Sequence, residues 1–173
     1  MQLSSRITGL LGGGSDGWGV FLRARQMIEQ GTQVTELTIG EHDIRTAAPI
    51  LQDMHRAALA GHTGYAAIPG TTGLRDAVAA RLQERTGVPT TRDNVLITTG
   101  GMQALDLIGK VLLEQGSLVA TQSPAYLGAF DAWRPRLPRY RAMILEADDF
   151  DPAAALTDAQ FAYTVPNFSN PSG

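Results

Sequence analysis

The stretch NVLITTGGMQALDLI, residues 94–108, changes its hydrophobic period at a pair of glycines. Residues 95–99 are apolar or β-branched, as in a buried strand, whereas the apolar residues of 104–112 recur at helical spacing. Gly100 and Gly101 permit a sharp turn and leave room for a ligand beside the backbone. The first turn of a helix carries unpaired N–H groups and a partial positive charge. The stretch therefore predicts a strand, a turn and a helix N-terminus suited to an anion such as phosphate.

This pattern alone does not establish an anion site. Many α/β crossovers use glycine only to turn the chain, and that interpretation stays open until other stretches are considered. Further strands are predicted at residues 34–39, 117–121, 141–145 and 161–165, and helices at residues 15–30, 48–60, 74–85, 123–133 and 151–158, with Thr72 as a cap. A strand, a helix and a strand across residues 95–121 indicate a parallel crossover unit and an α/β fold.

Length and composition restrict the class of protein. The 173 residues suffice for one domain with a sizeable core, and 43% hydrophobic with 18% charged residues indicates a globular rather than a disordered chain. A net charge of -3 argues against broad binding to nucleic acid or to an anionic membrane. No apolar run reaches transmembrane length, and we expect no secretory signal. The lack of cysteine excludes disulfides and thiol catalysis, and it fits a cytoplasmic protein.

Two clusters of polar residues suggest other functions, and we favour a structural interpretation of both. The three histidines lack the paired helical spacing of a zinc site, so no metal is expected. Four arginines between residues 134 and 141 could form a basic patch, but a solvated edge is the preferred interpretation.

Four motifs follow one another along the chain: GYAAIPGTTGLR (64–75), TTGGMQAL (98–105), SPAY (123–126) and VPNFSNPSG (165–173). In this order and spacing they resemble the pyridoxal-phosphate-dependent aminotransferases of class I/II, fold type I. The resemblance covers nearly the whole chain but only the front half of a complete family member. The middle of the chain looks most like the 2-aminoadipate aminotransferase branch.

The resemblance implies a fold and a domain organisation. We expect an incomplete α/β aminotransferase fold of type I. Residues 1–46 would form the N-terminal arm and the start of the small domain. Residues 47–173 would form the first part of the large pyridoxal-phosphate-binding domain. Because the chain stops inside a turn just after a strand, we expect it to be truncated.

The resemblance also implies pyridoxal 5′-phosphate as the cofactor and assigns its contacts. The backbone at Gly100, Gly101 and Met102 matches the family's phosphate-binding turn. Tyr126 matches the aromatic residue that stacks on the pyridine ring, and Asn170 matches the amide that donates to the ring's 3′-oxygen. Taken alone, Tyr126 would be interpreted as a core residue and Asn170 as a turn residue, so both roles depend on the resemblance.

Two further residues and one peptide bond have family counterparts. Tyr65 matches a residue that reaches the phosphate of the neighbouring subunit in family homodimers. Gly40 resembles a loop glycine near the substrate carboxylate. The bond between Asn170 and Pro171 is expected to be cis, since proline makes that isomer accessible and family members often have it there.

The family reaction needs a lysine that binds the cofactor, an acidic residue for the pyridine nitrogen and an arginine for the substrate carboxylate, all after the Asn-Pro-Ser-Gly loop. Lys110 is the only lysine here, and with Asp106 and Glu114 it is expected to form an exposed helical stripe. No catalytic residue is therefore assigned in this chain.

The predicted activity of the full protein is transfer of an amino group from an amino acid to a 2-oxo acid, with this chain as an inactive N-terminal portion of a homodimeric enzyme. Two alternatives stay open. One is an aminotransferase-like ligand-sensing domain of a transcription regulator, and the other is a different fold-type-I enzyme such as a β-lyase.

Overall fold

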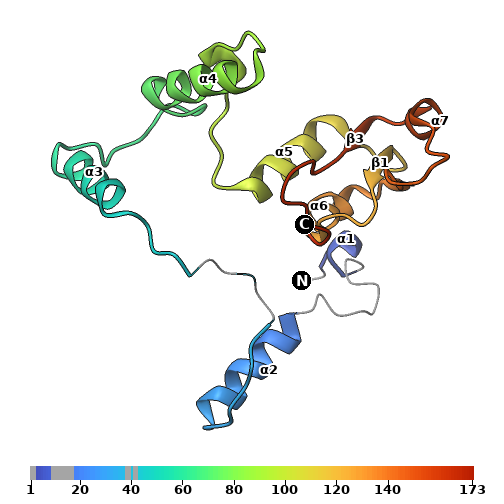
Figure 1. Cartoon of the computed structure of the whole chain (residues 1–173), viewed down its shortest axis with the longest axis horizontal. Helices are drawn as coiled ribbons and strands as arrows, with labels where there is room; N and C mark the ends of the chain where they lie inside the picture. Colours follow the sequence, from blue (N-terminus) through green and yellow to red (C-terminus); the bar gives the residue numbers. More distant parts are fainter. Residues whose placement is uncertain (1–2, 9–17, 38–39, 41–42) are drawn as a thin grey trace. The chain divides into compact units, whose positions relative to one another are not determined.

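The computed structural model describes residues 3–8, 18–37, 40 and 43–173. The chain divides into two units. Figure 1 colours their helices and strands along the sequence from blue to red. One comprises Pro69–Gly173 together with Met1–Leu10, and it includes the short helix α1 (Ser5–Thr8). The other comprises Leu11–Ile68.

In the described residues of the unit 11–68, helices α2 (Trp18–Glu29) and α3 (Ala48–Leu59) confirm the helices predicted at 15–30 and 48–60. Residues 15–17 of the predicted helix lie outside the described residues. Residues 32–37 are not a strand, which corrects the prediction for 34–39 in its described part. Arg25 links this segment to helix α2. Its guanidinium lies 3.4 Å from the Glu36 carboxylate and 5.1 Å from the centre of the Phe21 ring.

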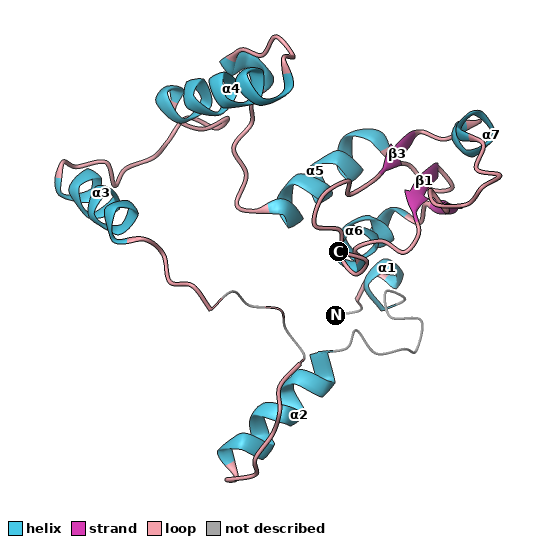
Figure 2. Cartoon of the chain, viewed as in Figure 1, coloured by secondary structure: helices cyan, strands magenta, loops and turns pink. Residues whose placement is uncertain are grey.

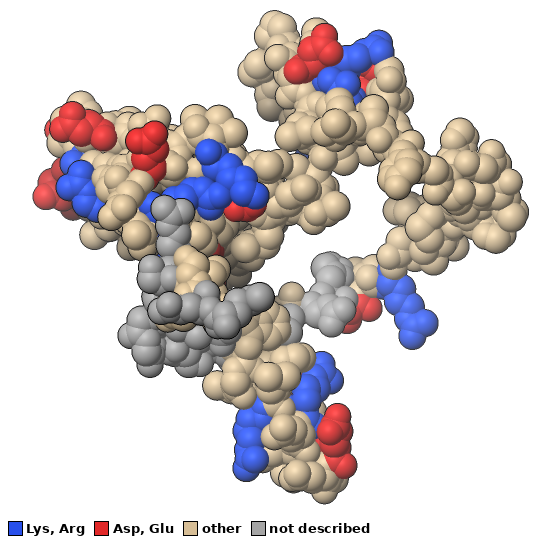
Figure 3. Space-filling model, turned by 180° about the vertical axis from the view of Figure 1, so that it is seen from behind, with Lys and Arg blue, Asp and Glu red and all other residues tan. Residues whose placement is uncertain are grey.

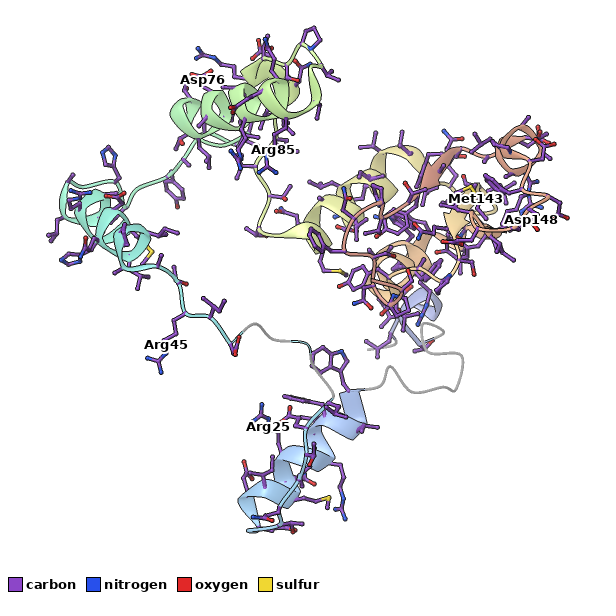
Figure 4. The ribbon with its side chains drawn as sticks, viewed as in Figure 1. Arg25, Arg45, Asp76, Arg85, Met143 and Asp148 are labelled. Carbon is purple, nitrogen blue, oxygen red and sulfur yellow. The ribbon has the colours of Figure 1, made fainter. Side chains whose placement is uncertain are left out.

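In the other unit, helix α4 (Thr72–Thr86) is followed by the 3-10 turn η1 (Arg92–Asn94). The helix predicted at 74–85 is confirmed, but Thr72 is its first residue and Thr71 occupies the cap position. An ion pair of 2.9 Å joins Arg92 of η1 to Asp76, which Figure 4 labels on α4. Contacts between side chains thus hold η1 against the helix.

Residues 95–98 do not form the predicted strand. Their backbone groups bond elsewhere. The Ile97 N–H donates to the Pro69 carbonyl at 3.0 Å, and Arg75 Nε donates to the Val95 carbonyl at 3.0 Å. The prediction failed because an apolar, β-branched run becomes a strand only when a neighbouring strand completes its hydrogen bonds, and here a loop and an arginine supply them.

Replacing Arg75 by methionine should lower the free energy of unfolding by about 1 to 3 kcal/mol. The Arg75 side chain is only 14% exposed, and besides Val95 it bonds the Arg92 carbonyl at 2.6 Å. Both carbonyls would lose their partner. Chemical denaturation followed by circular dichroism measures the change. Arg81→Met, at an exposed position of the same helix, is the control, and an equal loss in both variants would contradict the assigned role of Arg75.

Within the described residues, the sheet has three parallel strands in the order β2-β1-β3. Figure 2 draws strands in magenta and labels β1 and β3. The central strand β1 (Leu118–Gln122) confirms the prediction for 117–121, and β3 (Phe161–Tyr163) is shorter than predicted. β2 (Arg139–Met143) begins two residues earlier than predicted. The α/β class is therefore confirmed.

Helices connect and precede the strands. Helix α5 (Gly101–Leu112) leads to β1, and α6 (Leu127–Trp133) with the 3-10 turn η2 (Arg134–Arg136) connects β1 to β2. The short α7 (Pro152–Leu156) lies between β2 and β3 and confirms the helix predicted at 151–158. Helix α6 starts four residues later than predicted, because Tyr126 at its cap position has an extended backbone with ψ of 117°.

Trp133 is the centre of the core that joins these elements. Its side chain is fully buried with Leu113, Val119 and Ala129. Its ring meets those of Phe161 and Tyr163 edge to face, with centroid distances of 5.3 and 5.2 Å. The same residue therefore fastens α6 to the strand β3.

Within the part of the chain that the structure describes, no helix combines the length and the apolar character needed to cross a membrane.

Candidate functional site

The N-terminus of α5 begins at a backbone conformation that only glycine adopts readily. Gly100 occupies the cap position with φ of 95° and ψ of 172°. The preceding loop is fixed by side chains: Gln103 Oε1 accepts from the Thr99 N–H at 2.6 Å, and the Thr98 hydroxyl donates to the Gly100 carbonyl at 3.1 Å. No acidic residue lies in the first turn. The positive end of this helix is therefore not neutralised by its own side chains.

Space beside this turn is also available. A Cβ added to Gly100 or Gly101 would meet no other atom within 4 Å. A phosphate group bound by helix N–H groups needs such close approach to the backbone. The residues present at the start of α5 therefore fit the phosphate of the cofactor that the resemblance implies.

Tyr126 lies against this same helix start. Its hydroxyl is 3.8 Å from Met102 Sδ, and 37% of the residue is exposed. The Tyr126 ring packs directly against Gly128. A Cβ added to Gly128 would lie 2.4 Å from carbon atoms of this ring. The contact brings two residues assigned by the resemblance together, although they are 24 positions apart in the chain.

Asn170 lies in a loop that is fastened to the carboxyl end of β1. Gln122, the last residue of β1, accepts from the Val165 N–H at 3.0 Å and contacts Ser169 Oγ through its Nε2 at 3.4 Å. Ser169 is buried and Asn170 is exposed. The Asn170–Pro171 bond is cis, which confirms that prediction, and the Ser123–Pro124 bond is cis as well.

The assigned residues of this unit thus gather near one edge of the sheet. Tyr126 follows β1 by four residues and touches α5, while the loop with Asn170 is attached at the end of β1. In α/β folds with parallel strands, ligands bind beyond the carboxyl ends of the strands. Tyr65 and Gly40 lie in the other unit, and both are exposed.

Sequence reasoning missed Gln122, Ser169 and Gly128. A glutamine at the end of an otherwise apolar strand was a usable signal, since a buried amide requires hydrogen-bond partners. Nothing in the local pattern distinguished Gly128 from a glycine that merely permits a turn.

Lys110 lies on the exposed side of α5, as predicted. The predicted helical stripe is wrong for Glu114, because α5 ends at Leu112 and Leu113 has an extended backbone. Its ammonium is 2.6 Å from Asp106 Oδ2, and Arg136 approaches the other oxygen of that carboxylate at 3.3 Å. The hydrogen bond from Lys110, aided by the charges of Lys110 and Arg136, lowers the pKa of Asp106 below its ordinary value, and burial opposes this effect only in part. Lys110 therefore serves as an ion-pair partner in this structure.

The arginines of residues 134–141 also contact protein groups. Arg134 lies 2.7 Å from Asp131, Arg139 donates to the Gly116 carbonyl, and Arg141 donates to three carbonyls at the end of α7. On the face shown in Figure 3, basic side chains lie among acidic ones. Among the residues whose positions are described, no group of three or more histidine, aspartate or glutamate side chains is placed to hold a metal ion.

Comparison with known proteins finds relatives among the aminotransferases. No family model matches the chain. Over its whole length it is 30% identical to the arginine–pyruvate transaminase AruH of Pseudomonas aeruginosa, of which it spans 46%. Over 83% of its length it is 36% identical to the 2-aminoadipate transaminase of Thermus thermophilus, of which it spans 35%. The chain thus spans less than half the length of these relatives.

A solved structure and one regulator add to this finding. The aspartate aminotransferase from Thermus thermophilus with maleate matches 83% of this chain and 37% of its own, with a TM-score of 0.75 at 27% identity. The uncharacterized HTH-type transcriptional regulator YisV of Bacillus subtilis is 33% identical over 64% of this chain, which spans 24% of the regulator.

The fold is the aminotransferase fold of type I, present in part. Over its whole length, the chain is similar to part of the fold type I aminotransferases. The match to the 2-aminoadipate transaminase also agrees with the predicted likeness of its middle region.

Proposed function

We propose that this chain is part of an enzyme that transfers an amino group from an amino acid to a 2-oxo acid with pyridoxal 5′-phosphate. The observation that carries the proposal is the meeting of the glycine-led start of α5 with Tyr126 beyond the end of β1. When bound, the cofactor supplies the electron sink that this chemistry needs. The chain's own residues would hold it in place.

Each assigned residue has a separate task in this proposal. The N–H groups of Gly101 and Met102, turned by Gly100, bind the phosphate. Tyr126 covers the pyridine ring with its flat face and limits its tilt. Asn170 donates its amide to the 3′-oxygen.

Two residues of the unit of residues 11–68 have proposed roles that follow from the resemblance alone. Tyr65 would reach the phosphate bound by a second copy in a homodimer, and Gly40 would lie near the substrate carboxylate. We further propose that residues 1–46 form the N-terminal arm with the start of the small domain, that residues 47–173 begin the cofactor-binding domain, and that the protein is cytoplasmic.

Tyr126→Ala and Asn170→Ala should each weaken the affinity for pyridoxal phosphate by roughly tenfold, since one removes the stacking face and the other a hydrogen-bond donor. The measurement is a titration followed by the cofactor's absorption spectrum. Tyr126→Phe keeps the ring, and Asn167→Ala removes an exposed amide from the same loop, so both should bind as the unchanged chain does. Unaltered affinity and spectra in both alanine variants would refute the assigned roles.

The alternative function is a ligand-sensing domain of a transcription regulator, and the likeness to YisV supports it. Both functions use the same cofactor contacts, so cofactor binding does not separate them. The complete reading frame does: an upstream DNA-binding domain would favour the regulator, whereas a downstream lysine at the end of a strand, with amino-acid turnover, would favour the enzyme.

A further inference from the structure

Gln122 is a buried polar residue that joins the sheet to the loop carrying Asn170. Its exposed fraction is 8%, and that of its partner Ser169 is 7%. The two contacts of its amide reach residues 43 and 47 positions away, Val165 and Ser169. A single side chain therefore holds both the start of the loop and the residue immediately before Asn170.

The backbone of Gln122 is held in place by the sheet. Gln122 is in register with Met143 of β2, a residue 3% exposed that is labelled in Figure 4. The Ser123 N–H extends the ladder by donating to the Met143 carbonyl at 2.9 Å. The last strand β3 ends at Tyr163, before this loop begins. Gln122 thus links the loop to the sheet through its two side-chain contacts.

Because its amide is buried, Gln122 favours one position of the loop over others. An unpaired buried amide is unfavourable, so the loop arrangement that satisfies both Oε1 and Nε2 is preferred over arrangements that satisfy neither. A leucine of similar size would fill the space without selecting any loop position.

We propose that Gln122 is a positioning residue that sets Asn170 for its contact with the 3′-oxygen of the cofactor. This inference rests on the proposed function. Gln122 touches no cofactor atom in this scheme and acts through Ser169 and Asn170. Replacing Gln122 should therefore affect only the contact with the 3′-oxygen of the cofactor.

The experiment compares two probes that cannot react with amines. Pyridoxine 5′-phosphate carries the 3′-oxygen, and 3-deoxypyridoxine 5′-phosphate lacks it. Gln122→Leu should weaken binding of the first probe by roughly tenfold and leave the affinity for the second unchanged, because the phosphate contacts at α5 are retained. Fluorescence titration of the whole chain provides both dissociation constants.

Three variants separate positioning from general stability. Gln122→Leu combined with Asn170→Ala should bind the first probe no more weakly than Asn170→Ala alone, since both changes remove the same contact. Thr121→Val changes a buried residue of the same strand whose side chain points to the opposite face, and it should bind as the unchanged chain does. Ser169→Ala removes one of the two contacts, and it should give a smaller loss of the same selectivity if Gln122→Leu does not fold.

The outcomes distinguish this inference from the proposed function. Equal loss for both probes, or additive losses in the double variant, would overturn the positioning role while leaving cofactor binding intact. An unchanged chain that binds both probes equally well would overturn the contact to the 3′-oxygen. An unchanged chain that binds neither probe would overturn the proposed function and this inference together.

Discussion

Trp133→Ala is expected to lower the free energy of unfolding of the unit that contains the sheet by about 3 to 5 kcal/mol. The indole is fully buried, and its Nε1 donates to the Leu105 carbonyl of α5 at 2.8 Å. Its removal leaves a cavity between α5, α6 and β3, along with two aromatic rings that lose an edge-to-face partner. This loss is a large part of the total stability of a typical domain.

Chemical denaturation, followed by circular dichroism, measures this effect. Trp18→Ala is the matched control, because Trp18 is 56% exposed and lies in the other unit; its replacement should cost less than about 1 kcal/mol. Comparable losses in the two variants would contradict the central role of Trp133.

Gly109→Ala tests the same core from the opposite side. An added Cβ on Gly109 would lie 2.6 Å from Trp133 Cδ1, which is closer than carbon atoms approach in proteins. Either the indole or helix α5 must then move, and overpacking of this kind costs about 1 to 3 kcal/mol. The missing side chain at Gly109 is therefore part of the core's shape.

The elements of this unit could be predicted from sequence where the signal was local. Helices α4 and α5 follow from apolar spacing and from glycines at their ends, and β1 follows from a short apolar run. The failure at residues 95–98 has a different origin. Strand formation depends on a neighbour, and no pattern within the run reveals that its partners are Pro69 and Arg75.

The candidate site shows the same division. The glycine-led helix start could be predicted, because the backbone requirement lies within consecutive residues. The meeting of Tyr126 with Met102, and of Gln122 with the loop of Asn170, joins residues 24 to 47 positions apart. Such contacts follow from how the chain folds back at the end of β1, so sequence periodicity could not supply them.

The chain of 173 residues is expected to show no turnover of an amino acid with a 2-oxo acid in the presence of pyridoxal phosphate. Its only lysine is Lys110. The family reaction needs a lysine that binds the cofactor aldehyde covalently and moves the α-proton. Lys110 lies nine residues after Gly101 on the same helix, roughly 13 Å along its axis, and its ammonium is engaged by Asp106. A cofactor whose phosphate rests at the helix start would therefore have its aldehyde far from this amine.

Borohydride reduction with pyridoxal phosphate, followed by peptide mass analysis, tests this placement. We expect labelling of Lys110 to be weak and well below one equivalent, as for any exposed amine. Lys110→Arg preserves the ion pair with Asp106 and contains no lysine, so it should bind the cofactor with the same affinity as the unchanged chain. Stoichiometric labelling of Lys110, lost together with measurable turnover in Lys110→Arg, would show that this amine serves the reaction. The reduced cofactor affinity of Tyr126→Ala would then have to be explained by a ligand lying along α5 rather than at its start.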